Sequence, residues 1–187
     1  EEGPGGRLHL IPLTPSYAVD TFLVRAALEG LAAELAAHRI AETTLTSLQQ
    51  ILTETTDALI TNRFEVYSRS DTVLHQAVAE ACGNPVLVRE LRALRVHIDY
   101  IRGYSQRHAG AHLRRSHEEH QRIVEALAER NPLRARQAME VHLRQAGERI
   151  AQLIDWNRRR TAVGLGPQDH PSPTPASSLA SSPQPRR

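Results

Sequence analysis

Six amphipathic segments, separated by short breaks, constrain the fold of this chain more than any other feature of its sequence. In each segment apolar residues recur every three or four positions, which places them on one face of an α-helix. The sharpest breaks are Gly83-Asn84-Pro85 and Asn131-Pro132, because proline is tolerated in the first turn of a helix but not in its interior. The predicted helices cover residues 16–37, 42–60, 63–82, 85 to either 103 or 110, 113–130 and 132–158.

The connections between these segments are short, and no pair of strands is visible between them. Short connections make neighbouring helices antiparallel, which is the arrangement of a helical bundle. Aromatic residues make up only 4% of the chain, while apolar residues as a whole make up 40%, so the core must be largely aliphatic. The sequence therefore predicts an all-α fold, an antiparallel bundle of about six or seven helices.

The two ends of the chain differ from its middle. Residues 1–15 contain several glycines and prolines and are expected to form a short extended piece and a linker. Residues 161–187 are rich in proline and serine and are expected to form a flexible tail. The helical domain is therefore predicted over residues 16–160. We expect Ser16 to cap its first helix, with Leu23 and Leu31 on the buried face of that helix.

Several classes of protein are excluded by composition. The one cysteine, Cys82, excludes an internal disulfide and a cysteine-based zinc site, and it suits a reducing compartment. No apolar run approaches the roughly 20 residues that cross a bilayer, and no basic start followed by an apolar centre, the pattern of a secretory leader, is seen. The formal net charge of +2 is too small to indicate nucleic-acid binding by these residues. We therefore expect a cytoplasmic protein that does not bind membranes.

Four polar side chains stand where the helical pattern calls for apolar ones. Asp71 and His75 lie one turn apart on the inward face of the third predicted helix. His120 and His142 occupy inward positions of the fifth and sixth helices, and each lies eleven residues from Asn131. In an antiparallel hairpin both therefore lie about 16 Å from the turn. Because packed helix axes are about 8–10 Å apart, the two imidazoles can share a partner.

A divalent metal ion would satisfy all four of these groups at once. A buried carboxylate without a partner is costly, and buried imidazoles also need partners. Each residue taken singly is more often a hydrogen-bonded core residue than a ligand, but their joint placement favours a metal site. Imidazole and carboxylate suit zinc, nickel and similar ions. The predicted ligands are Asp71, His75, His120 and His142.

The neighbouring polar residues are expected to lie outside this site. His117 is most simply a solvated residue on the shoulder of its helix, although one turn before His120 it could also support a ligand. His112 is expected in a loop, together with His108, and His97 on the surface. Glu119 is adjacent to His120 and should point to another side of the helix, because successive residues of a helix face about 100° apart.

Four motifs of the chain, spread between residues 19 and 153, together resemble a known family. They are Arg25-Ala26-Ala27-Leu28-Glu29, Asp71-Thr72-Val73-Leu74-His75 followed by Gly83-Asn84-Pro85, Ser116-His117-Glu118-Glu119-His120 followed by Ile123, and Ala138-Met139-Glu140-Val141-His142-Leu143. The chain resembles the FadR-type C-terminal effector-binding domain of GntR-family transcription regulators, in its metal-binding branch. One departure is Leu74, where that family usually has phenylalanine.

The resemblance implies a helical effector-binding domain that is a homodimer in most relatives and controls an N-terminal winged helix-turn-helix domain. DNA would then be bound through that N-terminal domain, which is absent from this sequence, and residues 5–13 would be the end of its wing. The resemblance also implies that the four ligand positions hold a divalent metal. Open positions on such an ion could accept a small carboxylate effector. A positively charged side chain could bind the same effector carboxylate. Arg25 is the first candidate for this role, and Arg102 is the second.

Two other function classes remain open at this point. One is a helical mononuclear metalloenzyme that acts on small acids or esters, with Glu119 as a conceivable base. The other is a metal-free interaction module in which the four polar residues form a buried network. Metal content would distinguish the metal-free interaction module from a metal-dependent sensor. Turnover of small acids or esters would distinguish the metalloenzyme from the sensor. The sequence favours the sensor, which is not an enzyme.

Overall fold

The computed structural model describes residues 12–106 and 111–164, and all regular secondary structure in these ranges is helical. The helices are α1 (Pro15–Ala37), α2 (Glu42–Ile60), α3 (Phe64–Ala81), α4 (Pro85–Gln106), α5 (Ala111–Ala128) and α6 (Pro132–Ala162). The prediction of an all-α bundle is therefore confirmed. None of these described helices is long and apolar enough to cross a membrane. His108, Gly110, the first eleven residues and the predicted tail from residue 165 lie outside the described residues.

The helix ends are set by capping side chains close to the predicted breaks. Thr14, and not Ser16, caps α1, because Pro15 already occupies the first turn of the helix. The Thr14 hydroxyl accepts a hydrogen bond of 3.0 Å from the backbone N–H three residues later. At the α5–α6 turn the side chain of Asn131 caps α6 in the same way, at 3.1 Å. Gly83 follows α3 with a φ of +68°, a left-handed conformation that glycine adopts without strain.

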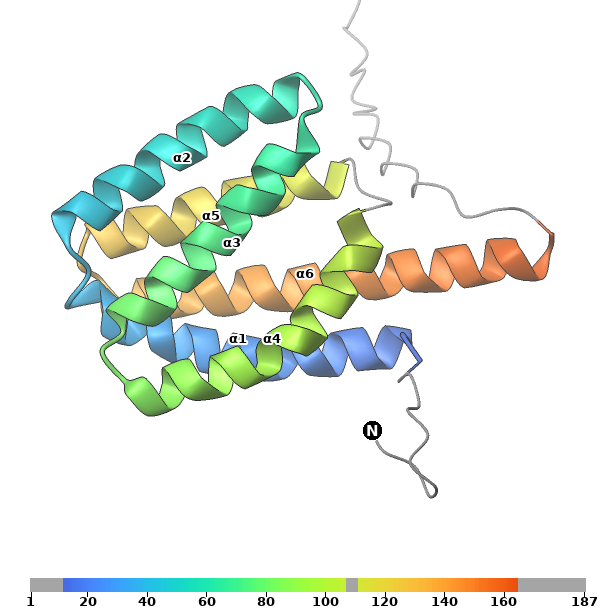
Figure 1. The fold of residues 1–187 in the computed structure, drawn as a ribbon, viewed down its shortest axis with the longest axis horizontal. Coiled ribbons are helices and arrows are strands. Elements are labelled where there is room, and N and C mark those ends of the chain that lie inside the picture. The colour runs from blue at the N-terminus through green and yellow to red at the C-terminus, as the bar shows by residue number, and fades with distance from the viewer. Residues whose placement is uncertain (1–11, 107–110, 165–187) are drawn as a thin grey trace, which may run out of the picture.

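Helices α1 and α6 lie antiparallel along most of the length of α1 (Figure 1) and approach each other closely. A Cβ atom added to Gly147 on α6 would lie 2.7 Å from the Cβ atom of Phe22 on α1. A Cβ atom added to Gly30 on α1 would lie 2.6 Å from the side chain of Glu140 on α6. Glycine at both positions therefore allows the two backbones to come together.

This close approach decides which residues of α1 are buried. Its inward face is built largely from alanine, including Ala18, Ala26 and Ala33, none of which is exposed. Leu23 and Leu31 point outward, with exposed fractions of 45% and 36%. The expectation that these leucines are buried was wrong, because the face of α1 that packs on the bundle is formed by these alanines and by Phe22, which lies against Gly147.

The other helices complete the bundle around this pair. Helix α5 packs beside α6, and α2 covers α3 and α5. Helices α3 and α4 both run diagonally across the front of the molecule in Figure 1, at an angle to α1 and α6, and α4 packs on α1. The middle of the bundle, where α3, α5 and α6 face one another, is filled by aliphatic side chains such as Leu74, Ile123 and Met139. The predicted metal ligands lie at this level of the bundle.

Candidate metal centre

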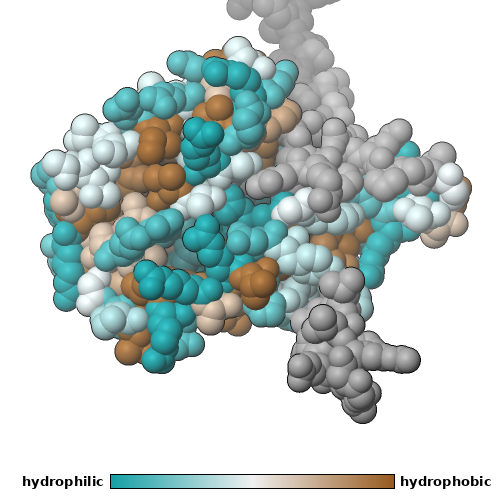
Figure 2. Space-filling model, in the orientation of Figure 1, coloured by the Kyte–Doolittle hydropathy of each residue, from teal (hydrophilic) through white to brown (hydrophobic). Residues whose placement is uncertain are grey.

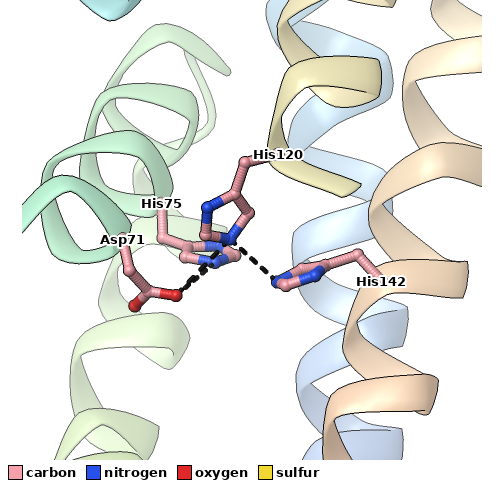
Figure 3. A group of neighbouring side chains, drawn as sticks. All are labelled: Asp71, His75, His120 and His142. Carbon is pink, nitrogen blue, oxygen red and sulfur yellow. Dashed lines mark hydrogen bonds and ion pairs between the residues drawn. The ribbon is translucent and has the colours of Figure 1, made fainter. Parts of the chain in front are cut away.

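Asp71, His75, His120 and His142 converge on one point inside the bundle. Asp71 and His75 come from α3, His120 from α5 and His142 from α6, and their side chains point toward one another (Figure 3). All four are buried. One possible ligand atom from each residue can be chosen so that all four atoms lie within 4.8 Å of one another. The described structure thus brings together the four residues that the sequence analysis selected.

The spacing of these atoms suits a metal ion. Ligands about 2.0–2.1 Å from a tetrahedral ion lie roughly 3.3 Å from one another. The Nε2 atom of His120 lies 3.2 Å from His142 Nε2 and 3.4 Å from Asp71 Oδ1. His75 Nε2 lies 3.6 Å from the same Asp71 oxygen. The group could therefore hold an ion after small side-chain adjustments.

Two of the imidazoles are oriented by carboxylates on their outer sides. A carboxylate only accepts hydrogen bonds, so the imidazole nitrogen that faces it must carry the proton. His75 Nδ1 donates to Glu29 on α1, and His142 Nδ1 donates to Glu119 at 2.8 Å. Each Nε2 atom therefore keeps its lone pair for the centre. His75 Nε2 is buried without a hydrogen-bond partner among the described residues, as expected of a nitrogen that is available to a metal.

Asp71 is oriented by Arg102 on α4. The carboxylate oxygen Oδ2 lies 2.7 Å from Arg102 Nη2, whereas Oδ1 faces the histidines. Arg102 also donates to the Thr72 hydroxyl and the Ser68 carbonyl, both on α3. Burial would raise the pKa of Asp71, but the Arg102 guanidinium and the neighbouring histidines hold it well below its usual value. The carboxylate is therefore ionised and ready to bind a cation.

The histidines differ in their tendency to be protonated. Burial and the adjacent His142 lower the pKa of His120 well below its usual value, and burial also lowers the pKa of His142. Burial works against the charged form of His75 too, but the Glu29 and Asp71 carboxylates together outweigh it and raise the pKa of His75. Metal ligation requires neutral imidazole. Burial therefore favours the ligating form of His120 and His142, whereas the neighbouring carboxylates make the neutral form of His75 less favourable than in the other two.

Glu119 and Arg149 form the outer support of His142, and the sequence analysis did not predict either role. Arg149 Nη1 and Nη2 each lie 2.7 Å from a Glu119 oxygen, and Nη2 also donates to the Ser116 hydroxyl at 2.9 Å. The expectation that Glu119 points away from the site was wrong. Helix α5 packs against α6, so Glu119 is buried beside His142 and Arg149 of α6, while His120 lies between His142 and Asp71 of α3.

The other histidines also differ from expectation. His117 is buried and lies 2.8 Å from the Thr56 hydroxyl on α2, so it is neither solvated nor a ligand of the centre. His112 lies within α5 and not in a loop. His97 is half-buried and its Nδ1 atom hydrogen-bonds the hydroxyl of Tyr17.

Arg25 and Glu29 form a buried pair on α1 next to His75. Arg25 Nε donates to Glu29 at 2.6 Å, and the Arg25 guanidinium lies over the Phe22 ring. Burial would raise the pKa of Glu29, but Arg25 and His75 lower it to about 2. Glu29 lies within one of the family motifs, yet nothing in its spacing indicated that it supports a ligand.

Two cavities border the centre. The larger, of about 120 Å³, lies between α1, α3 and α4 and reaches His75. In Figure 2, hydrophilic side chains surround a hollow in the surface between α3 and α4. The smaller cavity, of about 70 Å³, reaches Asp71 and His142 from the side of α5 and α6. Arg25 and Arg102 line both cavities.

Residues 20–145 match the sequence model of the FCD domain. The chain belongs to the FCD domain family. This confirms the predicted GntR-family, FadR-type C-terminal domain. FCD domains of GntR regulators are effector domains of transcription regulators and not enzymes, so the metalloenzyme alternative is set aside.

Two solved structures are similar to the chain. A GntR protein of Streptococcus agalactiae is 28% identical with a TM-score of 0.58, and the match covers 74% of this chain and 61% of that protein. The chain therefore spans less than two thirds of that relative. The metal-free FCD domain of TM0439, a protein assigned as a transcriptional regulator, shares the fold at 20% identity. Its TM-score is 0.63, with 76% of this chain and 96% of that one covered. No curated protein shows a significant match.

Proposed function

We propose that this FCD domain senses a small organic acid through a divalent metal ion and so controls a DNA-binding winged-helix domain in the same regulator. The observation that carries the proposal is the convergence of four buried ligand groups from three helices, two of them oriented by outer carboxylates. Outer carboxylates of this kind orient metal-binding histidines in many proteins.

In this proposal Asp71, His75, His120 and His142 hold the ion, which is zinc, nickel or a similar metal. Four protein ligands leave one or two positions open on an ion that accepts five or six. When bound, the ion would supply a Lewis acid to which a carboxylate can bind. The two cavities that border the centre give an acid room beside those positions.

Arg25 is the proposed protein cation for the effector. It is only 4% exposed, its Nε atom binds Glu29, and its guanidinium lines both cavities. Arg102 lines the same cavities, but it already binds Asp71, Thr72 and Ser68. We therefore assign Arg102 mainly to the orientation of Asp71, with effector binding as a secondary role.

We further propose that the domain acts as a homodimer in the cytoplasm. Helices α1 and α4 pack together and both carry apolar side chains that are exposed in the single chain. Val24 on α1 is 52% exposed and Val96 on α4 is 68% exposed. Binding of the effector would favour one arrangement of the dimer and so alter the spacing of the attached DNA-binding domains.

The first test is the metal content of protein purified without chelators. We expect about one divalent ion per chain, and elemental analysis that finds none would reject the metal site and favour the metal-free interaction module. His142→Ala should weaken metal binding at least about tenfold and leave helicity intact. His38→Ala, which changes an exposed histidine, is the matched control and should bind metal normally.

The second test addresses the effector. A carboxylate that binds the loaded protein should raise its melting temperature only when metal is present, because a ligand stabilises the state to which it binds. Hydroxy acids, sugar acids and dicarboxylates form the screening set. If no acid produces a metal-dependent shift, the acid-sensing part of the proposal is rejected while the metal site stands on its own measurement.

A further inference from the structure

The charged residues around the centre cancel one another. Three buried or nearly buried cations each pair with one anion, at 2.6 to 2.7 Å. The pairs are Arg25 with Glu29, Arg102 with Asp71, and Arg149 with Glu119. With neutral imidazoles the sum of these charges is zero. The outer rim of the larger cavity adds two arginines and two acidic residues, which also balance.

A divalent ion would disturb this balance. The ion brings two positive charges, and three of its four ligands are neutral imidazoles. The fourth ligand, the Asp71 carboxylate, already balances the charge of Arg102. The described interior holds no further buried acidic residue to offset them. An uncompensated charge inside a protein is strongly unfavourable. A bound monoanion would offset one of the two charges, and a dianion would offset both.

Arg25 shows where a second negative group would bind. Its Nε atom donates to Glu29, but its two Nη groups have no hydrogen-bond acceptor among the described residues. Arg149 contrasts with it, because both of its Nη groups donate to Glu119. Arg25 as a whole is only 4% exposed, and it borders both cavities, so an acid group in either cavity could accept hydrogen bonds from these donors.

We propose that the effector of this site is a small dianion, such as a dicarboxylic acid, with one acid group at the metal and the other on the Nη groups of Arg25. This inference rests on the proposed function, since it assumes that an acid binds beside the metal. The larger cavity has a volume of about 120 Å³, somewhat less than the roughly 150 Å³ of a cavity that binds benzene. The site therefore suits a short dianion and not a long-chain acid.

The test compares acids that differ in charge and not in shape. Isothermal titration of the zinc-loaded chain at neutral pH would measure malonate, succinate and glutarate, each against its own half-amide, which carries one charge less. We expect at least one diacid to bind about tenfold or more tightly than its half-amide. If every half-amide binds within about twofold of its diacid, the inference is wrong and the acid-sensing proposal survives. If none of these acids and half-amides binds, the inference is wrong, and the wider acid screen described above decides the acid-sensing proposal.

Variants of Arg25 test where the second acid group binds. Arg25→Lys keeps the charge and should keep most of the preference for the diacid. Arg25→Gln removes the charge and should reduce that preference to about twofold or less. The exposed residue Arg89 on α4 provides the control Arg89→Gln, which should behave as the unmodified chain. A folded, metal-loaded Arg25→Gln variant that keeps the full preference would overturn the inference, and the half-amide comparison applies even if that variant does not fold.

Discussion

Removal of the Glu119 carboxylate should separate the contribution of the outer network to the fold from its contribution to metal binding. Glu119 accepts two hydrogen bonds of 2.7 Å from Arg149 and one of 2.8 Å from His142. In Glu119→Ala the Arg149 guanidinium, which is only 8% exposed, keeps a single acceptor, the Ser116 hydroxyl. Loss of one partner from a buried ion pair costs about 3–5 kcal/mol.

That free energy corresponds to a large change in melting temperature. For a chain of this length each 1 kcal/mol lowers the melting temperature by about 2–4 °C, so we expect Glu119→Ala to melt roughly 6–20 °C below the unmodified protein. Metal affinity should fall about 10- to 100-fold, because His142 loses the carboxylate that orients it. Glu119→Gln keeps the shape of the side chain but not its charge. Its melting temperature and metal affinity should lie between those of Glu119→Ala and those of the unmodified protein.

The assay is thermal melting of the metal-free protein together with a competition titration of metal against a coloured chelator. Glu118→Ala is the matched control, since Glu118 is the exposed neighbour of Glu119 on the same helix. If Glu119→Ala melts within about 2 °C of this control, the buried network does not stabilise the fold. A large loss of stability with unchanged metal affinity would show that Glu119 supports the bundle and not the ion site.

Three further predictions concern acidity, packing and metal removal. The pKa of Glu29 is lowered from 4.5 to about 2, so its contribution to the free energy of unfolding is present above pH 4.5 and is lost as the pH falls from 4.5 toward 2. Urea unfolding of the metal-free protein across this range should show that loss, and Glu29→Gln should show less of it; identical profiles would contradict the assigned pairing. Gly147→Ala should destabilise the protein by about 1–3 kcal/mol because its new Cβ atom meets Phe22, whereas Gly103→Ala, with open space around it, should stabilise α4 by up to about 1 kcal/mol. Equal effects of these two changes in chemical denaturation would show that α1 and α6 are not tightly packed. A strong chelator should lower the melting temperature of protein purified with its metal, and re-addition of the ion should restore it; no change on chelation would argue against a bound ion.

The helices could be predicted closely because their ends depend on local chemistry. Helix α3 ends just before Gly83, and α4 begins at the proline two residues later. In the same way, Asn131 and the proline that follows it separate α5 from α6. Such residues interrupt a helix in almost any context. Each predicted end lies within a few residues of the observed one. The cap of α1 was misplaced by two residues, because Thr14 and Ser16 are both good capping residues on either side of Pro15.

The convergence of Asp71, His75, His120 and His142 could also be predicted, because each of these residues interrupts an apolar face. The residues that support the ligands could not. Glu29 and Glu119 lie about 100° from the face that the pattern selects, and each is buried because a second helix covers that side. The partner of Glu119 is Arg149, thirty residues away. Such pairs depend on how the helices pack, which the periodicity of one helix does not reveal.

The two glycine contacts between α1 and α6 hold the backbones of these helices close together, with Gly147 against Phe22 and Gly30 against Glu140. Because the two helices pack so closely, we expect them to move as one body. His142 lies little more than one helical turn from Gly147. A movement of the backbone at His142 when an ion binds would therefore be expected to move both α6 and α1. Arg158 lies toward the far end of α6, about 24 Å along the helix axis from His142. Its side chain donates a hydrogen bond to the carbonyl of Leu13, just before α1. If α1 and α6 move as one body, a displacement at the centre of the bundle would therefore be felt at Leu13, just before α1.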